Sequence, residues 1–347
     1  MGGPARDRLY PDEEDGAPDD FSCEVMRHED QHVIDMATVD QAYADWDDLI
    51  SHSGRQVADE RISVWDGLLD NLDLEIGDNI MLRNPDIPNQ SAPYTILQTH
   101  EDEDAHSIRM GWGGRNRLHK DKSDEEVNTP DRFAVEITQF APNHRIADSE
   151  SGNELDTSFT EVEHHSENDI IVTAPHGGWI EPGTSEQTRI LYNLLDDCSL
   201  WNFEGNNDGG GSFDRWHITS VDVQGECFPG FGMVEDHDWD WAISIHGFSY
   251  DTFLVGGLAP MGLREEIVSE VEDVIDAQGD DIEVTAPSED EWELFNAHSE
   301  DNYINRMTEN GQSGIQIEQP WETRQDEYVE EIPKAIARGL TSYLDSE

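Results

Sequence analysis

Short apolar runs alternate with amphipathic helical segments from residue 169 onward. The run IIVTAP at 170–175 is followed later by WAISIHG at 241–247 and GIQIEQP at 314–320. Between the last two, the segment 263–279 has apolar residues spaced three and four apart and ends in a glycine. Strands that alternate with helices are joined by crossovers and pair largely in parallel. The sequence therefore predicts an α/β fold, with a mixed, largely parallel sheet and flanking helices.

Three of these strands end in a side chain suited to metal binding or acid–base chemistry. His176 follows the first strand, and the second and third strands end in His246 and Glu318. Ligands of open α/β sheets bind beyond the carboxyl ends of the strands. Glu181 lies on the loop after the first strand, so His176, Glu181 and His246 would make the two-histidine, one-carboxylate set of a catalytic zinc site. The glycines beside both histidines would let the backbone approach the ion and its substrate closely.

Each residue of this set also has an ordinary explanation. A histidine at a strand end is commonly a structural or surface residue. A single acid in so acidic a chain is most simply a solvated surface group. The joint placement of the residues, and no single one of them, favours a metal site.

Six motifs in this part of the chain occur in the order in which a known family has them. They are APHGGWIEPGTSE at 174–186, WNFEG at 201–205, HITS at 217–220, SIHG at 244–247, VGGL at 255–258 and INRMTENGQSGIQIE at 304–318. The ordered set resembles the poly-γ-glutamate hydrolases of phage-related type, which are zinc peptidases with a carboxypeptidase-like α/β fold. The resemblance covers residues 169–340 and leaves 1–168 outside it. It implies an enzyme that uses zinc (Zn2+) to hydrolyse γ-glutamyl amide bonds of poly-γ-glutamate or a related glutamyl substrate.

The resemblance also implies a role for each residue of the predicted site. His176 and Glu181 match the family's HGG-x-IE metal motif, and His246 matches its third metal ligand. Glu318 matches the glutamate of the G-x-Q-x-E strand, which implies a general base that takes a proton from the zinc-activated water and passes it to the leaving amine.

Substrate contacts are implied for His217 of the HITS motif and for Arg306, whose planar guanidinium suits a substrate carboxylate. Asn305 would add a hydrogen bond, and Arg324 is a substitute for the arginine contact. His217 could instead cap or pack, and Arg306 could be a surface ion-pair partner. The stretch 221–241 is long and unusual for the family, which leaves the shape of the substrate groove open.

A second motif, HEDQH at 28–32, matches the H-E-x-x-H pattern of zinc metalloproteases. On a helix, His28 and His32 would share one face. The intervening Asp30 and Gln31 are polar, so such a helix would have no apolar side to bury. We interpret both histidines as surface residues, and whether they bind metal stays open.

The first half of the chain has a different pattern of apolar and turn residues. Its strand-like pieces are short and separated by turn signals, and they lie at 74–84, 94–101, 106–118 and 132–141. The sequence predicts four parts, namely a loose acidic N-terminus at 1–20, a small β-rich accessory domain at 21–145, a polar linker at 146–168 and a zinc hydrolase domain at 169–347. The accessory domain could bind polymer or mediate assembly, and the sequence favours neither.

The chain carries 79 acidic and 20 basic residues, a formal net charge of −59 at pH 7. The acids are spread along the chain with apolar runs between them, so the charge does not indicate an acidic tail. Because the Debye length falls to ~3 Å in molar salt, self-repulsion would be screened there, and we predict a halophilic protein. The acidic balance also argues against a nucleic-acid partner.

The three cysteines, Cys23, Cys198 and Cys227, are scattered without a CxxC motif, so a disulfide framework is not expected. The sequence has no apolar run of about 18 residues, so no membrane span is expected. The segment 1–20 has no apolar core typical of a signal peptide. We therefore expect a cytoplasmic location by default, with an extracellular one left open, and the sequence indicates no oligomeric state.

Two other functions stay open beside polymer hydrolysis. The same metal site could serve an amidohydrolase of small acyl-glutamate substrates. A non-catalytic binding module that retains the fold is a different class, and loss of a metal ligand or of the base would mark it. The ligands and the base are all present, which favours an enzyme.

Overall fold

The computed structural model describes most of the chain from Val33 onward. The described residues are 33–41, 59–72, 74–85, 91–100, 107–119, 133–138, 158–164, 169–195, 198–206, 211–225, 228–288 and 295–346. All of them belong to the unit Gln31–Glu347. The expected loose N-terminus at 1–20 and the HEDQH stretch with His28 and His32 lie outside the described residues, as do Cys23 and Cys227.

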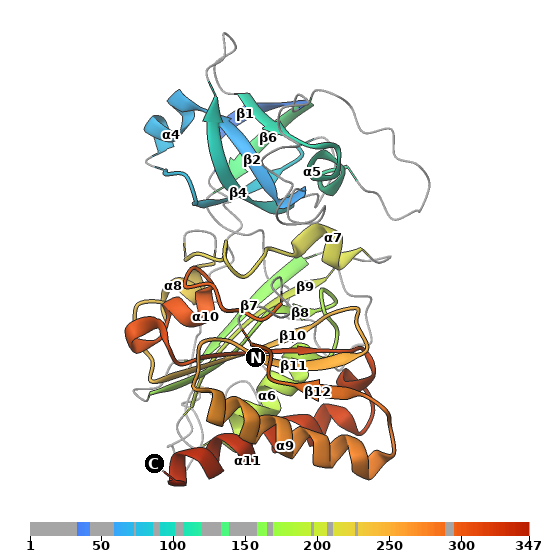
Figure 1. The fold of residues 1–347 in the computed structure, drawn as a ribbon. Coiled ribbons are helices and arrows are strands. Elements are labelled where there is room, and N and C mark those ends of the chain that lie inside the picture. The colour runs from blue at the N-terminus through green and yellow to red at the C-terminus, as the bar shows by residue number, and fades with distance from the viewer. Residues whose placement is uncertain are drawn as a thin grey trace, which may run out of the picture. The chain divides into compact units, whose positions relative to one another are not determined.

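The strands of the first half of the chain form a closed barrel in the order β1-β5-β2-β4-β3-β6 (Figure 1). They are β1 (Val33–Gln41), β2 (Arg61–Trp65), β3 (Asn79–Arg83), β4 (Ser91–His100), β5 (Ser107–Met110) and β6 (Phe133–Thr138). A cluster of buried apolar side chains fills the barrel, among them Ile62 and Val64 of β2 and Ile80 and Leu82 of β3. Because the sheet closes on itself, it leaves no unpaired strand edge.

One predicted strand of the barrel is shorter than expected. The piece 106–118 contains β5 and then a helix, α5 (Trp112–Arg117). The apolar alternation ends at Met110, and three of the next four residues are glycines. A Cβ on Gly114 would meet the backbone oxygen of Asp59 at 3.1 Å, so the glycine lets α5 pack directly on neighbouring backbone. A second short helix, α4 (Asp66–Leu72), follows β2.

The second half of the chain builds a seven-stranded sheet in the order β12-β11-β13-β10-β8-β9-β7. Its strands are β7 (Ser158–His164), β8 (Ile170–Gly178), β9 (Cys198–Asn206), β10 (Trp241–Gly247), β11 (Thr252–Gly256), β12 (Glu283–Thr285) and β13 (Gly314–Gln319). The pairs β8–β9, β8–β10, β10–β13 and β11–β12 are parallel, whereas β7–β9 and β11–β13 are antiparallel. The prediction of a mixed, largely parallel α/β sheet is confirmed.

Strand β7 lies inside the range expected to be a polar linker. It is the edge strand of the sheet and pairs antiparallel with β9 from Ser158↔Asn206 to His164↔Leu200. Glu161 accepts a hydrogen bond from the indole Nε1 of Trp201 at 2.9 Å. An edge strand has one unpaired side and tolerates polar residues, which is why its sequence lacks the apolar character of the central strands.

The two faces of the central strands differ in chemistry. Ile243 and Ile245 of β10 belong to a large apolar cluster with Ile315 and Ile317 of β13. The alternate positions of both strands are polar and point to the opposite face, because successive side chains of a strand alternate. These polar positions are Ser244, His246, Gln316 and Glu318.

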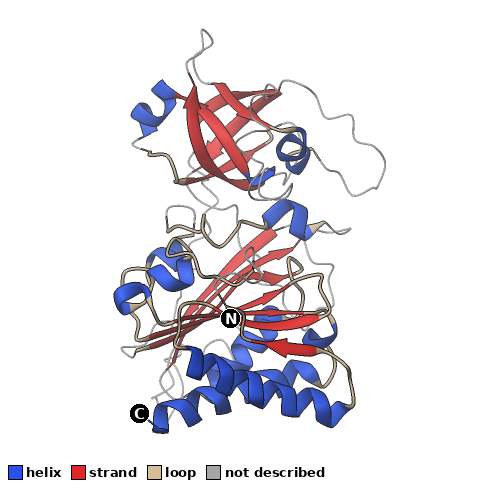
Figure 2. Ribbon diagram, in the orientation of Figure 1, coloured by secondary structure: helices blue, strands red, loops and turns tan. Residues whose placement is uncertain are grey.

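Helices α6 (Thr184–Leu194), α9 (Met261–Gln278) and α11 (Tyr328–Ser346) cover the apolar face of the sheet (Figures 1 and 2). α9 ends at Gly279, whose φ of +82° suits glycine, as the sequence predicted. The short helices α7 (Ser212–Trp216), α8 (Pro229–Gly232) and α10 (Tyr303–Arg306) contribute aromatic side chains to a second cluster, with Trp216, Phe231 and Tyr303 buried. Among the described helices, none is long and apolar enough to cross a membrane.

Candidate metal centre

The ends of β8, β10 and β13 bring four ionisable side chains together. β10 and β13 are parallel neighbours, and their register pairs His246 with Glu318. β8 is the other neighbour of β10 and carries His176 near its end. Glu181 follows in the turn that precedes α6. All four side chains are buried, with exposed fractions between 2% and 7%.

The polar atoms of these side chains converge on one point. Nδ1 of His176 lies 2.9 Å from Oε1 of Glu181 and 3.1 Å from Nδ1 of His246. The His246 Nδ1 atom is also 3.7 Å from Oε2 of Glu181 and 3.9 Å from Oε1 of Glu318. Two ring nitrogens that face each other at this distance cannot both present lone pairs without repulsion. The arrangement therefore calls for a proton or a cation between them.

The tautomer of His176 follows from its second nitrogen. Nε2 of His176 lies 2.8 Å from the backbone oxygen of Ile218, which can only accept, so Nε2 carries a hydrogen and donates it. In the neutral ring, Nδ1 then keeps its lone pair, which is the form in which histidine binds a metal. For His246, Nε2 is buried without a hydrogen-bond partner among the described residues, whereas Nδ1 lies 3.1 Å from Nδ1 of His176.

Charge and burial pull the pKa values of this group apart. Burial alone would raise the pKa of Glu181, but the charge of His176 and its hydrogen bond outweigh burial and bring the pKa to about 2. Burial would lower the pKa of His176, yet the carboxylate of Glu181 raises it. Burial and the charge of His176 lower the pKa of His246 to about 3. Glu181 therefore favours the protonated form of His176, and burial disfavours the protonated form of His246.

The turn after β8 orients the Glu181 carboxylate. Its backbone N–H donates to the carbonyl of His176 at 2.8 Å, and Thr184 Oγ1 donates to its carbonyl at 2.8 Å. Oε2 accepts from the backbone N–H of Gly247 at 2.8 Å. Because the N–H of Gly247 on β10 holds Oε2, the other carboxylate oxygen, Oε1, faces His176.

The glycines beside the histidines allow close packing of neighbouring groups, whereas the sequence suggested that they allow close approach to an ion. A Cβ on Gly177 or on Gly178 would meet a backbone oxygen of β9 at 2.9 Å, and the φ of Gly178 is +67°. Both glycines therefore let β8 lie against β9. A Cβ on Gly247 would lie 2.2 Å from Cζ of Arg324. The absence of a side chain at Gly247 makes room for this guanidinium.

Glu318 has the environment of a proton carrier. Burial raises its pKa well above the usual value and the nearby charge of Glu181 adds to this, while the Gln316 hydrogen bond and the Arg324 charge oppose it. Gln316 Nε2 donates to Oε1 of Glu318 at 2.8 Å, and Gln316 Oε1 accepts from Asn302 Nδ2 at 3.0 Å. A carboxyl group with a raised pKa and a fixed orientation suits general acid–base chemistry.

Arg324 brings a positive charge to this acidic group. It lies in the short 3-10 helix η3 (Glu322–Arg324) after β13 and is 6% exposed. Nη1 donates to the Pro182 carbonyl at 2.8 Å. Burial lowers the pKa of Arg324, and the carboxylates of Glu181 and Glu318 counteract that effect. The guanidinium thus balances charge between the two carboxyl groups.

His217 lies beside the cluster. Its ring centroid is 4.1 Å from that of His176, and a potential ligand atom from each of His176, Glu181 and His217 lies within 4.8 Å of the others, so these groups could hold a metal ion. Nδ1 of His217 is 2.5 Å from Oε1 of Glu60. Burial would raise the pKa of Glu60, but the charge and hydrogen bond of His217 lower it overall.

Two predicted substrate contacts lie in other surroundings. Asn305 is fully buried, and its Nδ2 donates to the carbonyls of Ala297 and Ser299, both at 2.8 Å. Arg306 is exposed and donates to the carbonyls of Asp301 at 2.7 Å and Val223 at 2.6 Å. Both side chains thus already donate hydrogen bonds to backbone carbonyls.

Sequence reasoning missed several residues of this site. Gln316 could have been found, since it lies two positions before Glu318 and so shares its face of β13. Tyr303, whose hydroxyl lies 2.6 Å from Ser244 Oγ and 2.8 Å from Thr173 Oγ1 beneath the site, carries no such signal. Glu60 carries none either, because it reaches His217 from 157 residues away.

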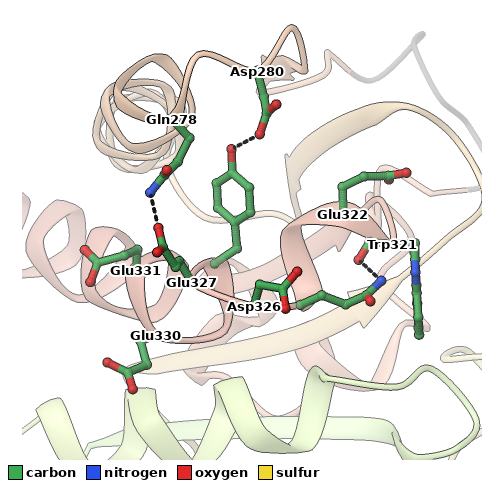
Figure 3. A pocket seen from close by; sticks show the side chains of 10 residues that line it. Gln278, Asp280, Trp321, Glu322, Asp326, Glu327, Glu330 and Glu331 are labelled. Atoms are coloured by element: carbon green, nitrogen blue, oxygen red, sulfur yellow. Dashed lines mark hydrogen bonds between the residues drawn. The ribbon is translucent and has the colours of Figure 1, made fainter.

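A large acidic pocket lies at the start of α11 and has another set of lining residues. Its volume is about 1160 Å³, and Figure 3 shows Glu322, Asp326, Glu327, Glu330 and Glu331 around it. Asp280 accepts a hydrogen bond from Tyr328 there at 2.6 Å. None of the side chains that converge around His176 lines this pocket. Its carboxylates would repel an anionic polymer.

Comparison with protein families gives one match over the sheet-forming half of the chain. A family model described as Poly-gamma-glutamate hydrolase matches residues 146–337. This range is more than half of the 347 residues. It contains the four converging side chains and His217, and it leaves the barrel outside.

The individual relatives match this chain either over a short stretch or at low sequence identity. The chain is 39% identical over 90 residues to the SPbeta prophage-derived UPF0714 protein YoqZ of Bacillus subtilis (strain 168); the match covers 25% of this chain and 30% of that protein. A structure titled bacteriophage poly-gamma-glutamate hydrolase is 25% identical, with a TM-score of 0.45, and 57% of this chain and 95% of that chain are covered. A structure titled YNDL-apo (Zinc-free) is 23% identical, with a TM-score of 0.43 and coverage of 59% and 97%.

Proposed function

Because this chain belongs to the poly-gamma-glutamate hydrolase family, we propose that it is a zinc-dependent hydrolase that cleaves the γ-glutamyl amide bonds of poly-γ-glutamate. The family implies a hydrolase that acts on a glutamate polymer. Zinc, the bond that is cut and the roles of single residues are our assignments.

The observation that carries the proposal is the convergence of two imidazole nitrogens and a carboxylate oxygen. Nδ1 of His176 is 3.1 Å from Nδ1 of His246 and 2.9 Å from Oε1 of Glu181. Two histidines and one carboxylate are a donor set that zinc accepts in catalytic sites, and the facing nitrogens need a cation or a proton between them. We assign these three residues as the metal ligands. When bound, zinc would acidify a water molecule and polarise the scissile carbonyl.

Glu318 is assigned as the general base. Its Oε1 is 3.9 Å from Nδ1 of His246, so the carboxyl group borders the proposed ligands without belonging to them. The Gln316 hydrogen bond holds its orientation. Because burial raises its pKa, Glu318 can accept a proton from the attacking water and return it to the leaving amine. Arg324 limits the repulsion between Glu318 and Glu181.

His217 is assigned as the substrate contact, because its ring borders the proposed ligands and is partly exposed, with a side-chain exposure of 13%. Asn305 and Arg306, which the sequence also suggested as substrate contacts, are assigned to holding the loops around them. Their donors already bind backbone carbonyls, and breaking such bonds to bind substrate would leave those carbonyls unpaired.

Metal analysis and a polymer assay on purified variants test these roles. Glu318→Gln is expected to bind as much zinc as the wild type and to hydrolyse poly-γ-glutamate roughly 10²–10⁴-fold more slowly, since it can no longer carry the proton. Glu283→Gln is the matched control, because Glu283 is exposed on β12 of the same sheet. If Glu318→Gln keeps its activity, the base lies elsewhere.

The paired variant His28→Ala/His32→Ala tests the HEDQH stretch and should leave the zinc content unchanged. Loss of the ion would move the metal site to the HEDQH stretch.

Sizing the products separates endo- from exo-cleavage of the polymer. Turnover of small acyl-glutamates without polymer cleavage would favour the amidohydrolase alternative. Zinc binding without any hydrolysis would favour a binding module.

We also propose that the enzyme works in concentrated salt, because its formal net charge of −59 opposes the approach of an anionic polymer in dilute buffer. Molar salt shortens the Debye length to ~3 Å and removes that repulsion. The rate of polymer cleavage should therefore rise with salt concentration. Equal turnover in dilute buffer would contradict halophilic adaptation and would leave the hydrolase assignment standing.

A further inference from the structure

Glu60, immediately before β2 of the barrel, contributes a carboxylate to the surroundings of the proposed active site. It is 4% exposed. Its Oε1 lies 2.5 Å from Nδ1 of His217, and its Oε2 accepts from the backbone N–H of Thr219 at 2.9 Å. Both carboxylate oxygens of Glu60 thus bind residues of the HITS motif. The family match begins at residue 146, so Glu60 lies outside it.

The ring of His217 is held on both faces as well. Phe213 stacks on it with a centroid distance of 4.3 Å and an interplanar angle of 26°. The ring of His176 lies on it at 4.1 Å and 33°. Since a carboxylate only accepts hydrogen bonds, the hydrogen of His217 must reside on Nδ1. The second nitrogen, Nε2, then becomes the polar atom that the ring can offer to a substrate.

Neighbouring contacts hold the same segment to the barrel. Arg61, the residue after Glu60, forms a bidentate pair with Asp222, with Nε–Oδ2 at 2.9 Å and Nη2–Oδ1 at 3.1 Å. Arg117 of α5 donates to the carbonyls of Arg215 and His217 at 2.8 and 2.9 Å. Of these contacts, only that of Glu60 reaches the imidazole of His217. The others hold backbone or a distant carboxylate.

We propose that Glu60 is a positioning residue of the hydrolase, which holds His217 as the Nδ1–H tautomer so that Nε2 faces the substrate. This inference rests on the proposed function. It makes the barrel part of the active centre, in place of an accessory module that acts by itself. At metal-ligating histidines, a carboxylate on the second ring nitrogen affects metal affinity or activity by roughly 10–100-fold, and we take the same range for the contact to His217.

The test compares Glu60→Gln with Arg61→Gln in the full chain. Glu60→Gln keeps an acceptor for the Thr219 N–H but presents an amide N–H₂ to His217, so the ring must accept at Nδ1 and move its hydrogen to Nε2. Arg61→Gln removes the adjacent ion pair with Asp222 and leaves the Glu60 contact intact. Nitrogen NMR on histidine-labelled protein reads the tautomer of His217, and steady-state kinetics and zinc content are measured on the same samples.

We expect Glu60→Gln to move the His217 hydrogen to Nε2, to lower kcat/KM by roughly 10–100-fold, and to keep its zinc. Arg61→Gln should show the wild-type tautomer and a smaller loss. Glu60→Asp, which retains an acceptor, should keep the Nδ1–H signal if it reaches the ring, and should then retain more activity than Glu60→Gln.

Three results would overturn the inference. The first is wild-type kcat/KM in a folded Glu60→Gln. The second is an equal loss in Arg61→Gln, which would mean that Glu60 only docks the barrel. The third is faster hydrolysis in Glu60→Gln, which would mean that Glu60 occupies the place of a substrate carboxylate. If the wild type cleaves no glutamyl substrate, the proposed function fails, whereas the NMR readout still decides whether Glu60 sets the tautomer.

Discussion

The barrel holds a half-buried histidine and the seven-stranded sheet holds two buried ones, and the two surroundings differ. In the barrel, Nδ1 of His100 lies 2.7 Å from Ser63 Oγ and Nε2 lies 2.8 Å from Ser107 Oγ. Hydroxyl groups can donate or accept, so either tautomer of His100 is satisfied. In the sheet, His176 and His246 face each other at 3.1 Å beside Glu181. That second arrangement cannot satisfy itself without a proton or a cation.

The difference follows from the fact that one sheet is closed and the other is open. The barrel closes on itself, and both partners of His100 lie on other strands of it, Ser63 on β2 and Ser107 on β5. The open sheet ends its parallel strands at a common edge, where side chains from separate strands meet. A buried group left short of partners costs free energy, and such groups occur where function requires them. The edge of the open sheet, and not the barrel interior, is where chemistry is expected.

The largest effect that tests this contrast is metal loss. His246→Ala removes one proposed ligand and should abolish both bound zinc and hydrolysis, as measured by metal analysis and polymer cleavage. His100→Ala is the control, because it removes a half-buried histidine that bonds to the hydroxyls of Ser63 and Ser107. It should keep its zinc and lose only stability. Equal zinc content in the two variants would remove the distinction between the two histidine environments.

A smaller effect is expected from crowding Arg324. The methyl group of Gly247→Ala would lie 2.2 Å from Cζ of Arg324 and would push the guanidinium away from Glu181 and Glu318. A misplacement of about 1 Å near a reacting group can cost on the order of 10²-fold, and we expect a loss of kcat of this order.

Gly262→Ala is the control for this substitution. Its added methyl would meet only Tyr343, at an ordinary 3.6 Å, and alanine in helix α9 should stabilise the protein by about 0.5–1 kcal/mol. Urea unfolding and kinetics separate the two variants. A Gly247→Ala enzyme with full activity would show that the place of Arg324 does not matter.

The smallest effect concerns a buried group with no part in the proposed chemistry. Burial raises the pKa of the Cys198 thiol to about 12, and the side chain is 3% exposed at the start of β9. Because the thiolate is the reactive form, Cys198 should resist iodoacetamide in the native protein and react in urea. Peptide mass spectrometry after labelling reads this position alone. Rapid native labelling would mean that β9 opens locally.

Much of the sheet was predictable because local pattern and tertiary environment agree. The apolar runs of β8, β10 and β13 are buried central strands, and their length and spacing were visible in the residues. β7 was not predicted, because an edge strand paired on one side needs no apolar run. The helix α5 was hidden inside a strand-like piece, and its Gly114 packs against the backbone of Asp59.

For the candidate site too, some features could be predicted from the sequence and others could not. His176, Glu181, His246 and Glu318 could be named from the sequence, since strand ends of a parallel sheet share an edge. Asn305 and Arg306 could be named as well, and the structure adds that both donate to backbone carbonyls. No pattern distinguishes a guanidinium aimed at a ligand from one that holds a loop. Only the arrangement of the loop decides that.

By itself the sequence determined the class of fold and the residues at the shared end of its parallel strands, because both follow from the period of apolar side chains and from where that period stops. The tertiary structure alone decided which charges meet. Glu60 reaches His217 across 157 positions, and Arg324 fits against Gly247 because no side chain is there. Such contacts depend on the register and closure of whole sheets, which no short window of residues contains.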